Sequence, residues 1–361
     1  MVDITPQSLE QFIGRPADEL PTPAFVLTST LREIRGLLPL VQEGILEEIL
    51  YGIPLRPSAL PFLHALRTSS GARILLTLDH ASQITALEAF NRTAASPAPW
   101  PAFIKVDPGY RRAGLAPTSP RLAALVAAAQ RSPAVRVRGF YAHAGHSYGA
   151  RTADDAAAVL RAEVDAALAA AALLDRSADD DDEPVVVSFG ATPTAHVVRE
   201  LLLRAGAAEV PGRGGVRLEL HAGNFVANDL QQLGTGCVSA GDLAVRVLAE
   251  VCSVYPERGE AVVNAGAIAL GRETGPIAGY GRVVGGVGEW IVGRVSQEHG
   301  IVTAAAGGEE GVGMVEERFE VGDKVWLHVQ HACIAAAAHH YYFVVDDEDV
   351  VREVWWPWKG W

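Results

Sequence analysis

The sequence predicts an α/β fold, with a parallel sheet closed as a barrel and a mainly β domain after it. In the first two thirds of the 361 residues, short apolar or β-branched runs alternate with helix-like segments. This rhythm is typical of repeated βα units. After about Gly236 it gives way to glycine-rich, strand-like pieces such as residues 243–256 and 289–302, which indicate a β domain. The length exceeds that of one usual core, which favours two domains or one barrel with an appendage.

The elements of the first part follow in a regular order. Ser82–Asn91 and the Ala-rich Ala153–Leu174 have the composition of helices, and the acidic start of the second suits a helix N-terminus. Functional groups of such a fold gather where its strands end. The expected strand-containing runs are residues 47–55, 72–80, 101–109, 135–145, 184–194 and 216–224.

The domain boundaries are expected where the pattern of strand-like and helix-like segments changes along the sequence. We expect an N-terminal arm over residues 1–24, a barrel domain over 25–236 and a C-terminal β domain over 237–361. Two stretches inside the barrel domain, the acidic run 176–184 and the glycine-rich 211–215, are expected as surface loops.

Composition narrows the class of partner. A formal net charge of −13 argues against nucleic acid and against an anionic membrane surface, which leaves a small molecule as the expected substrate. Three cysteines in no framework spacing suit a reducing compartment. The first 16 residues lack the pattern of a secretory signal, and no uncharged run approaches membrane-spanning length. We therefore expect a cytoplasmic protein.

Two strand ends carry ionisable side chains. "VDPGYRRAG" places Arg112 in a Gly-Pro turn, where a guanidinium could bind an anion or form a surface salt bridge. "YAHAGHSY" gathers Tyr141, His143, His146 and Tyr148 within eight residues, as either a binding loop or a structural cluster whose members satisfy one another.

Two further strand ends combine glycine with small polar residues. In "SFGATPTAH", Thr192 precedes an expected helix, so hydroxyls and backbone N–H groups could hold a phosphate or simply cap that helix. "HAGNFVANDLQQ" repeats the pattern with Gly223 and Asn224, where glycine permits close backbone approach.

The pair His331 and Cys333, in "VQHACIAAAAHH", is a candidate metal site. Residues two apart on a strand point to the same face, and an imidazole with a thiolate suits zinc. Taken alone, the pair does not distinguish a metal site from two buried residues of a strand.

Six ordered motifs together resemble the eukaryotic-type D-serine dehydratases, within the alanine racemase-like class of pyridoxal-phosphate enzymes that also includes D-threonine aldolases. The resemblance spans roughly Leu46 to the C-terminus and rests on "VDPGYRRAG", "YAHAGHSY", "SFGATPT", "LELHAGN", "GRVSQEHG" and "GDKVWLHVQHACIAA". It implies a (β/α)8 TIM-type barrel with pyridoxal phosphate at its mouth, a β domain that lends residues to the site, and a homodimer.

The resemblance also implies roles for individual residues. Arg112 would bind the phenolic oxygen of the cofactor, with Tyr141 and Tyr148 lining the pocket. The phosphate would be held by Thr192, Gly223 and Asn224. His331 and Cys333 would bind zinc with positions left open for water and substrate. His339 and His340 are expected as strand or surface residues.

The implied reaction removes water from a D-β-hydroxy amino acid. The cofactor ring takes up the electrons of the α-carbanion, zinc binds the β-hydroxyl, and D-serine yields pyruvate and ammonia. A D-threonine aldolase would cleave the Cα–Cβ bond on the same scaffold, but Cys333 favours the dehydratase because the aldolase pair has Asp in that place. A catalytically dead protein that binds pyridoxal phosphate or an amino acid is the third alternative.

One residue that the resemblance requires has no counterpart. The family carries a lysine near the N-terminus that holds the cofactor as a Schiff base and moves the α-proton. The chain has only Lys105, Lys324 and Lys359, and none lies in a matching run. "ELPTPAF" resembles the first strand of the family, and "VLTSTLREIRGLL" resembles the segment after the lysine strand. The resemblance therefore implies that a helix, the lysine strand and a second helix are missing between about Phe25 and Val26.

Two explanations of the missing block remain open. One is an error in the predicted coding sequence, such as a skipped exon, and the other is a true truncation that makes a pseudoenzyme. The completeness of the other pocket residues favours the first. No catalytic residue is identified, because Lys105 is expected to be a buried lysine paired with a carboxylate rather than a substitute.

Overall fold

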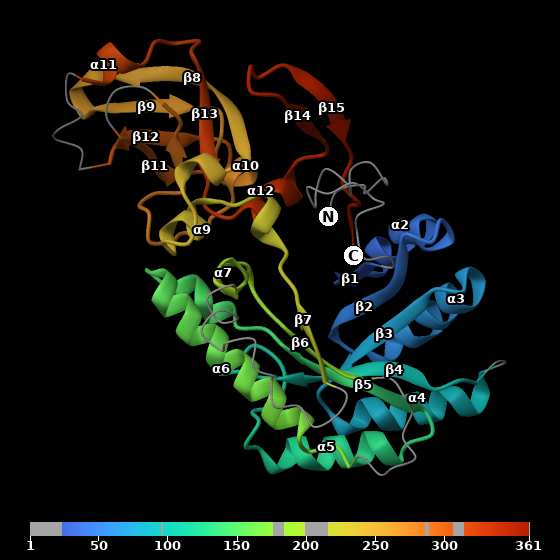
Figure 1. Cartoon of the computed structure of the whole chain (residues 1–361). Helices are drawn as coiled ribbons and strands as arrows, with labels where there is room; N and C mark the ends of the chain where they lie inside the picture. Colours follow the sequence, from blue (N-terminus) through green and yellow to red (C-terminus); the bar gives the residue numbers. More distant parts are fainter. Residues whose placement is uncertain are drawn as a thin grey trace. The chain divides into compact units, whose positions relative to one another are not determined.

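The computed structural model describes residues 24–94, 97–175, 184–198, 216–285, 289–305 and 314–360. The chain divides into a first unit of Met1–Ser147, Ala157–Ala222 and Trp358–Trp361 and a second unit of Tyr148–Ala156 and Gly223–Pro357. We describe each unit by itself (Figure 1). The expected arm at 1–24 and the expected loops at 176–184 and 211–215 lie outside the described residues, except for Ala24 and Pro184.

Seven parallel strands form one curled sheet in the described part of the first unit, paired in chain order from β1 to β7. Figure 1 shows helices α3 to α6 on the outer side of this sheet. The expected α/β fold is confirmed. The strands are β1 (Ala24–Thr28), β2 (Leu46–Pro54), β3 (Arg73–Leu78), β4 (Trp100–Val106), β5 (Val135–Ala142), β6 (Val185–Phe189) and β7 (Val216–Leu220). The helices are α2 (Leu31–Gln42), α3 (Leu60–Ser70), α4 (Ala81–Thr93), α5 (Pro120–Arg131), α6 (Ala153–Ala171) and α7 (Thr192–His196).

Strand β1 runs straight through the Phe25–Val26 junction. Phe25 pairs with Glu48 and Val26 with Ile49, so the junction lies inside a parallel ladder, one residue after a register shift between Ala24 and Phe25. Among the described residues, β1 pairs only with β2 and β7 only with β6. The described strands thus form the incomplete barrel that the sequence predicts, and no ladder joins β1 to β7 among the described residues.

Local sequence signals explain where the helices begin and end. Thr30 and Glu33 form a capping box: the Glu33 N–H donates to Thr30 Oγ1 at 3.1 Å, and the Thr30 N–H donates to Glu33 Oε2 at 2.9 Å. Helix α3 ends at Gly71, whose φ of 72° lies in the left-handed region that glycine adopts without strain. These signals are local, so the sequence predicts the boundaries that they set.

The inner face of the sheet is apolar in its middle layer. Residues from β2 to β6 pack there with Phe25 and Leu27 against them, namely Leu50, Leu75, Phe103, Tyr141 and Val186. Because alternate residues of a strand share a face, Lys105 points to the same side as Phe103. A lysine is therefore placed inside the curled sheet next to an apolar layer.

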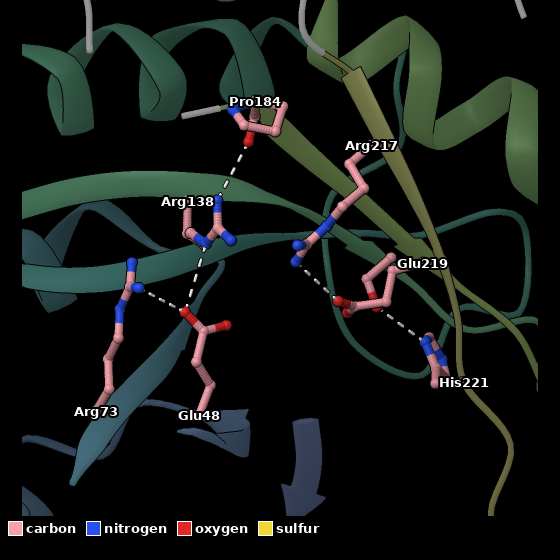
Figure 2. Close-up of polar contacts among 8 residues, drawn as sticks. Glu48, Arg73, Arg138, Pro184, Arg217, Glu219 and His221 are labelled. Carbon is pink, nitrogen blue, oxygen red and sulfur yellow. Dashed lines mark hydrogen bonds and ion pairs between the residues drawn. The ribbon is translucent and has the colours of Figure 1, made fainter. Parts of the chain in front are cut away.

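Charged side chains lie beside this layer (Figure 2). Glu48 on β2 forms ion pairs with Arg73 on β3 at 3.0 Å and with Arg138 on β5 at 3.7 Å. Arg138 also donates to the Pro184 carbonyl at 3.1 Å. Glu48 and Arg138 are 6% and 8% exposed, so each buried charge has an opposite charge near it, as burial requires.

The second unit is mainly β, as predicted. Six antiparallel strands close a small barrel in the order β10-β11-β12-β9-β8-β13. Its core includes Trp290 and Phe319, whose rings meet edge to face at 5.1 Å. The strands are β8 (Arg246–Tyr255), β9 (Glu260–Val263), β10 (Gly281–Val283), β11 (Trp290–Val295), β12 (Gly300–Ala304) and β13 (Lys324–Val329), with a separate hairpin of β14 (Tyr342–Val345) and β15 (Val351–Trp355). Short helices complete the unit: α9 (Leu230–Gly234), α10 (Ala267–Leu270), α11 (Val315–Arg318) and α12 (Ala332–Ala338).

The expected strand through His331 and Cys333 is wrong. Strand β13 ends at Val329, and helix α12 begins at Ala332, so Cys333 lies in the first turn of a helix. The buried Gln330 side chain donates to the carbonyls of Ile277 and Gly279 at 2.8 Å each, which diverts the chain from the strand direction. The alanines that follow are strong helix formers. None of the described helices is long and apolar enough to cross a membrane.

Candidate active site

A row of polar residues crosses the inner face of the first unit. Lys105 pairs in register with Tyr141, Tyr141 with Ser188, and Ser188 with Glu219. Register partners of a parallel sheet point to the same side, so β4 to β7 each contribute one polar side chain at the same level. The row lies toward the carboxyl ends of these strands, where the sequence predicts the site.

Tyr141, a predicted cofactor residue, is the centre of this row. Its ring is 4% exposed and stacks on the His221 ring at a centroid distance of 4.3 Å. Burial raises the pKa of the Tyr141 phenol above its ordinary value, so the hydroxyl keeps its proton at neutral pH.

Lys105 is buried, as predicted, but without the predicted carboxylate partner in ion-pair contact among the described residues. The side chain is 4% exposed, and Nζ lies 3.7 Å from the Tyr141 ring centroid. Burial, aided by the charge of Arg112, lowers the pKa of Lys105 to about 7, against the opposing effect of Glu163. A large fraction of this amine is therefore uncharged near neutral pH.

Arg112, predicted to bind the phenolic oxygen of the cofactor, lies in the loop after β4. Asp107 shapes this loop by accepting hydrogen bonds from the N–H groups of Gly109 and Arg111 at 2.9 Å each. Arg111 adopts a φ of 59° at this turn. The loop places a positive charge near Lys105, where it contributes to the lowered pKa of the lysine.

His143 lies beyond the end of β5 as a neutral imidazole. Its Nδ1 lies 2.8 Å from the Gly190 carbonyl oxygen, which can only accept, so Nδ1 carries the proton. Burial, aided by Arg112, lowers the pKa of His143 to about 4. The lone pair of Nε2 is thus available at neutral pH as an acceptor or base.

Glu163 of α6 holds two of the strand-end loops together. Its Oε1 accepts hydrogen bonds from the N–H groups of Ala144 at 2.7 Å and Gly190 at 3.1 Å, and Thr194 Oγ1 lies 3.4 Å from Oε2. The residue is fully buried, and burial raises the pKa of its carboxyl. Glu163 therefore fixes the loop after β5 relative to the loop after β6.

Thr192, a predicted phosphate residue, is the first residue of the five-residue helix α7 and is 2% exposed. It follows Gly190, whose φ is 142°. A Cβ on Gly190 would lie 2.1 Å from the His221 carbonyl oxygen, so only glycine fits there. Thr192 belongs to the first unit, whereas the other predicted phosphate residues, Gly223 and Asn224, belong to the second.

The second unit brings Asn224 next to the predicted metal pair. Asn224 is 3% exposed, and its Oδ1 lies 4.0 Å from Cys333 Sγ. Gly223, just before it, is exposed, and nothing lies within 4 Å of where its Cβ would stand. Asp229 accepts from Asn224 Nδ2 at 2.6 Å and from the Ala332 N–H at 2.8 Å.

The rings of Tyr148 and His331 stack at 6.4 Å in the second unit. Cys333 is an exposed, free cysteine. No group of three or more His, Cys, Asp or Glu side chains in the described part of the chain is placed to hold a metal ion. The pair thus has suitable donor chemistry but provides only two donors.

Three residues of these clusters were not predicted from the sequence. Glu163 is hidden in the Ala-rich helix, where a glutamate looks like part of a solvated face. His221 lies inside a recognised motif, but nothing in the sequence indicates its stacking on Tyr141. Asp229 precedes a helix, and its cap, in which Oδ1 accepts from the Gln232 N–H at 3.0 Å, is the only local signal that it carries.

Comparisons with known proteins match both halves of the chain. Residues 27–208 match the family "Alanine racemase, N-terminal domain", and residues 244–345 match the "Putative serine dehydratase domain". The D-serine dehydratase of Schizosaccharomyces pombe is 39% identical over 93% of this chain and 79% of its own length. The D-serine dehydratase of Saccharomyces cerevisiae is 35% identical over 93% of this chain and 81% of its own length.

Solved structures agree with these sequence matches. A cysteine-to-alanine variant of D-threo-3-hydroxyaspartate dehydratase, in its metal-free form, superposes with a TM-score of 0.78 at 28% identity, over 94% of this chain and 85% of the other. The matches extend through both units of the chain and include the segments that carry Lys105, Tyr141 and Glu163. The chain belongs to the D-serine dehydratase family of lyases, with an alanine racemase-like fold.

Proposed function

We propose that this protein is built for the dehydration of D-serine to pyruvate and ammonia with pyridoxal phosphate and zinc. The observation that carries the proposal is the 39% identity to a D-serine dehydratase over 93% of the chain. The polar row of the first unit and the His331–Cys333 pair of the second support it.

The residues of the first unit fit the non-covalent part of cofactor binding. The charge of Arg112 acts on the buried phenol of Tyr141 and favours its ionised form against the effect of burial on the pKa. His221 Nε2 is a buried polar atom without a hydrogen-bond partner in the described residues. Bound pyridoxal phosphate supplies an electron sink for the α-carbanion of an amino acid. Arg112 would hold the phenolic oxygen, and Thr192, with Gly223 and Asn224 of the second unit, would hold the phosphate.

The chain's own groups have distinct tasks in this proposal. The neutral phenol of Tyr141 and the ring of Tyr148 orient the cofactor and exclude water. His143 Nε2 accepts a proton or hydrogen bond at neutral pH, because the lowered pKa keeps the imidazole uncharged. Glu163 keeps the loops that carry His143 and Gly190 in place.

His331 and Cys333 are proposed to hold zinc, which would act as a Lewis acid toward the β-hydroxyl of the substrate. One imidazole and one exposed thiol are suitable donors. Solved structures of D-threo-3-hydroxyaspartate dehydratase include a histidine-to-alanine variant and a metal-free cysteine-to-alanine variant. The two substituted positions are two apart, as His331 and Cys333 are here.

The residues present do not fit the covalent attachment of the cofactor. The described residues contain no lysine at the place that the family resemblance requires, and β1 joins the flanking segments directly. We therefore propose that the chain as written binds the cofactor without a covalent link and does not turn over D-serine. A non-catalytic pyridoxal-phosphate-binding protein is the second candidate, and the same missing lysine favours it.

Product analysis tests the assignment of the reaction. A segment with the lysine that the family resemblance requires would be inserted between Phe25 and Val26, and the protein supplied with pyridoxal phosphate, zinc and D-serine or D-threonine. A dehydratase forms pyruvate from D-serine and 2-oxobutanoate from D-threonine, each with ammonia. Glycine and acetaldehyde from D-threonine would instead assign an aldolase, and no product at all would favour the binding protein.

The assembly and location of the protein are proposals of the same kind. We propose a cytoplasmic homodimer that acts on a small D-amino acid, without nucleic-acid or membrane partners. Light scattering behind size-exclusion chromatography tests the dimer, because a monomer at micromolar concentration would contradict it.

A further inference from the structure

Asp229 has no assigned role above, yet it is almost fully buried and joins separate segments of the second unit. The residue is 2% exposed. Its Oδ2 accepts from Asn224 Nδ2 at 2.6 Å and from the Ala332 N–H at 2.8 Å, while Oδ1 accepts from the Gln232 N–H at 3.0 Å. One carboxylate thus connects the turn at Asn224, the start of α9 and the residue between His331 and Cys333.

A second contact binds the same two segments. The Gln231 N–H donates to the Gln330 carbonyl oxygen at 3.1 Å, and the Gln330 side chain is itself held by two backbone carbonyls. The backbone of His331 is therefore fixed on both sides, through Gln330 and through Ala332. The position of the metal pair depends on α9, about 100 residues earlier in the chain.

Asp229 also sets the orientation of the Asn224 amide. Because Nδ2 donates to the carboxylate, Oδ1 is the atom that faces Cys333 Sγ. Rotation of the amide would place Oδ1 against Asp229 Oδ2, where two acceptors oppose each other. The charged hydrogen bond thus favours a single orientation.

We propose that Asp229 is a positioning residue that couples the Asn224 turn to the metal pair His331 and Cys333. The proposal rests on the proposed roles of those three residues. A ligand that orders the Asn224 turn then orders the segment with His331 and Cys333 as well. Bound pyridoxal phosphate therefore raises the affinity of the chain for zinc, and bound zinc raises its affinity for pyridoxal phosphate. Such coupling is reciprocal by thermodynamic necessity.

Two substitutions in the full chain distinguish the two roles of Asp229, which are to connect Asn224 with Ala332 and to cap helix α9. Asp229→Ser keeps a good N-cap for α9 but is too short to reach Ala332. Asp229→Asn keeps the shape of the side chain, yet its amide cannot accept at both oxygen positions. Asp323→Asn is the matched control, because Asp323 also accepts a backbone hydrogen bond, from the Glu320 N–H at 2.8 Å, and its carboxylate makes no hydrogen bond with Asn224, Gln232 or Ala332 among the described residues.

The readout is zinc affinity, measured by competition with a chromogenic chelator with and without pyridoxal phosphate. We expect both Asp229 variants to bind zinc about 10-fold or more weakly, as when other residues that orient metal ligands are changed. Pyridoxal phosphate should raise the zinc affinity of the unaltered chain and of Asp323→Asn, but not that of the Asp229 variants. A purely structural role would lower thermal stability without abolishing this linkage.

The possible outcomes distinguish this proposal from the proposed function. Unchanged zinc affinity and linkage in a folded Asp229 variant, or an equal loss in Asp323→Asn, overturn the role of Asp229 and leave the metal assignment intact. No zinc on the unaltered chain overturns both. If neither Asp229 variant folds, the zinc affinity of the unaltered chain is the test. The same zinc affinity with and without pyridoxal phosphate contradicts the coupling.

Discussion

The ammonium nitrogen of Lys105 lies 3.7 Å from the centroid of the Tyr141 ring, inside the curled sheet. The aromatic face stabilises the charged form of the lysine, whereas burial and the nearby Arg112 disfavour it. Because the pKa of Lys105 falls to about 7, the penalty from burial and from the charge of Arg112 outweighs the stabilisation by the Tyr141 ring.

This arrangement predicts a pH-dependent gain in stability for Lys105→Met. The penalty for charging Lys105 is absent above the unfolded pKa near 10.5, grows as the pH falls and is complete below the folded pKa of about 7. The free energy of unfolding of the Met variant should exceed that of the unaltered chain at pH 7, and this excess should shrink by roughly 3 kcal/mol by pH 9.5. Urea unfolding at both pH values measures this excess. A difference in the free energy of unfolding that does not change with pH would contradict a penalty for charging the buried Lys105.

A second prediction concerns Glu163. Burial raises the pKa of this carboxyl, so the penalty for ionising it is absent below about pH 4.5, grows as the pH rises toward the folded pKa and is complete above it. Glu163→Gln removes the penalty and keeps an Oε1 that can accept from Ala144 and Gly190. It should therefore be at least as stable as the unaltered chain at pH 7 and relatively less stable at pH 4.

Glu163→Ala provides the contrast. It leaves two buried N–H groups without an acceptor and should cost about 2–5 kcal/mol. Chemical denaturation of the three proteins measures these differences. Equal losses in the Gln and Ala variants at pH 7 would show that the charge itself, rather than the pair of hydrogen bonds, holds the loops.

Lys105 and Glu163 show why part of the site could not be predicted from the sequence. The strands through Lys105 and Tyr141 follow from local apolar runs, and α6 follows from its composition, so the sequence predicts the elements and their order. The burial of Glu163 depends on Ala144 and Gly190, which lie 19 and 27 residues away. No period or motif within α6 contains that information.

The start of α12 was missed for a similar reason. His331 and Cys333 follow a β-branched run, and the local sequence pattern continues the two-residue period of a strand through them. The turn at Gln330 depends on the carbonyls of Ile277 and Gly279, about 50 residues earlier in the chain. The identities of the candidate ligands were readable from the sequence, whereas their backbone geometry was not.

The metal pair yields a third prediction. The purified chain should contain stoichiometric zinc, and the double variant His331→Ala with Cys333→Ala should lose it, because these are the two proposed protein donors. Cys252→Ala and His339→Ala are matched controls: Cys252 is exposed, and His339 Nε2 lies 3.1 Å from the Ala269 carbonyl oxygen. Elemental analysis after gel filtration measures the metal, and zinc retained by the double variant would assign it to other ligands.

The incomplete sheet yields a fourth prediction. In the described residues, β1 and β7 each have one strand neighbour, and an unpaired edge beside an apolar inner face favours association. The apparent molar mass from light scattering should rise with protein concentration, and insertion of the lysine-bearing segment between Phe25 and Val26 should reduce that rise. A monodisperse sample with a sharp, reversible thermal transition would speak against an exposed edge.

The most direct test of the central claim is pyruvate formation from D-serine, with pyridoxal phosphate and zinc present. Three proteins are compared: the chain as written, its Lys105→Ala variant, and the chain with the lysine-bearing segment inserted. We expect background rates from the first two, because neither has the group that holds the cofactor and moves the α-proton, and a rate several powers of ten higher from the third. Robust pyruvate formation by the chain as written, abolished by Lys105→Ala, would contradict the account and make Lys105 the catalyst.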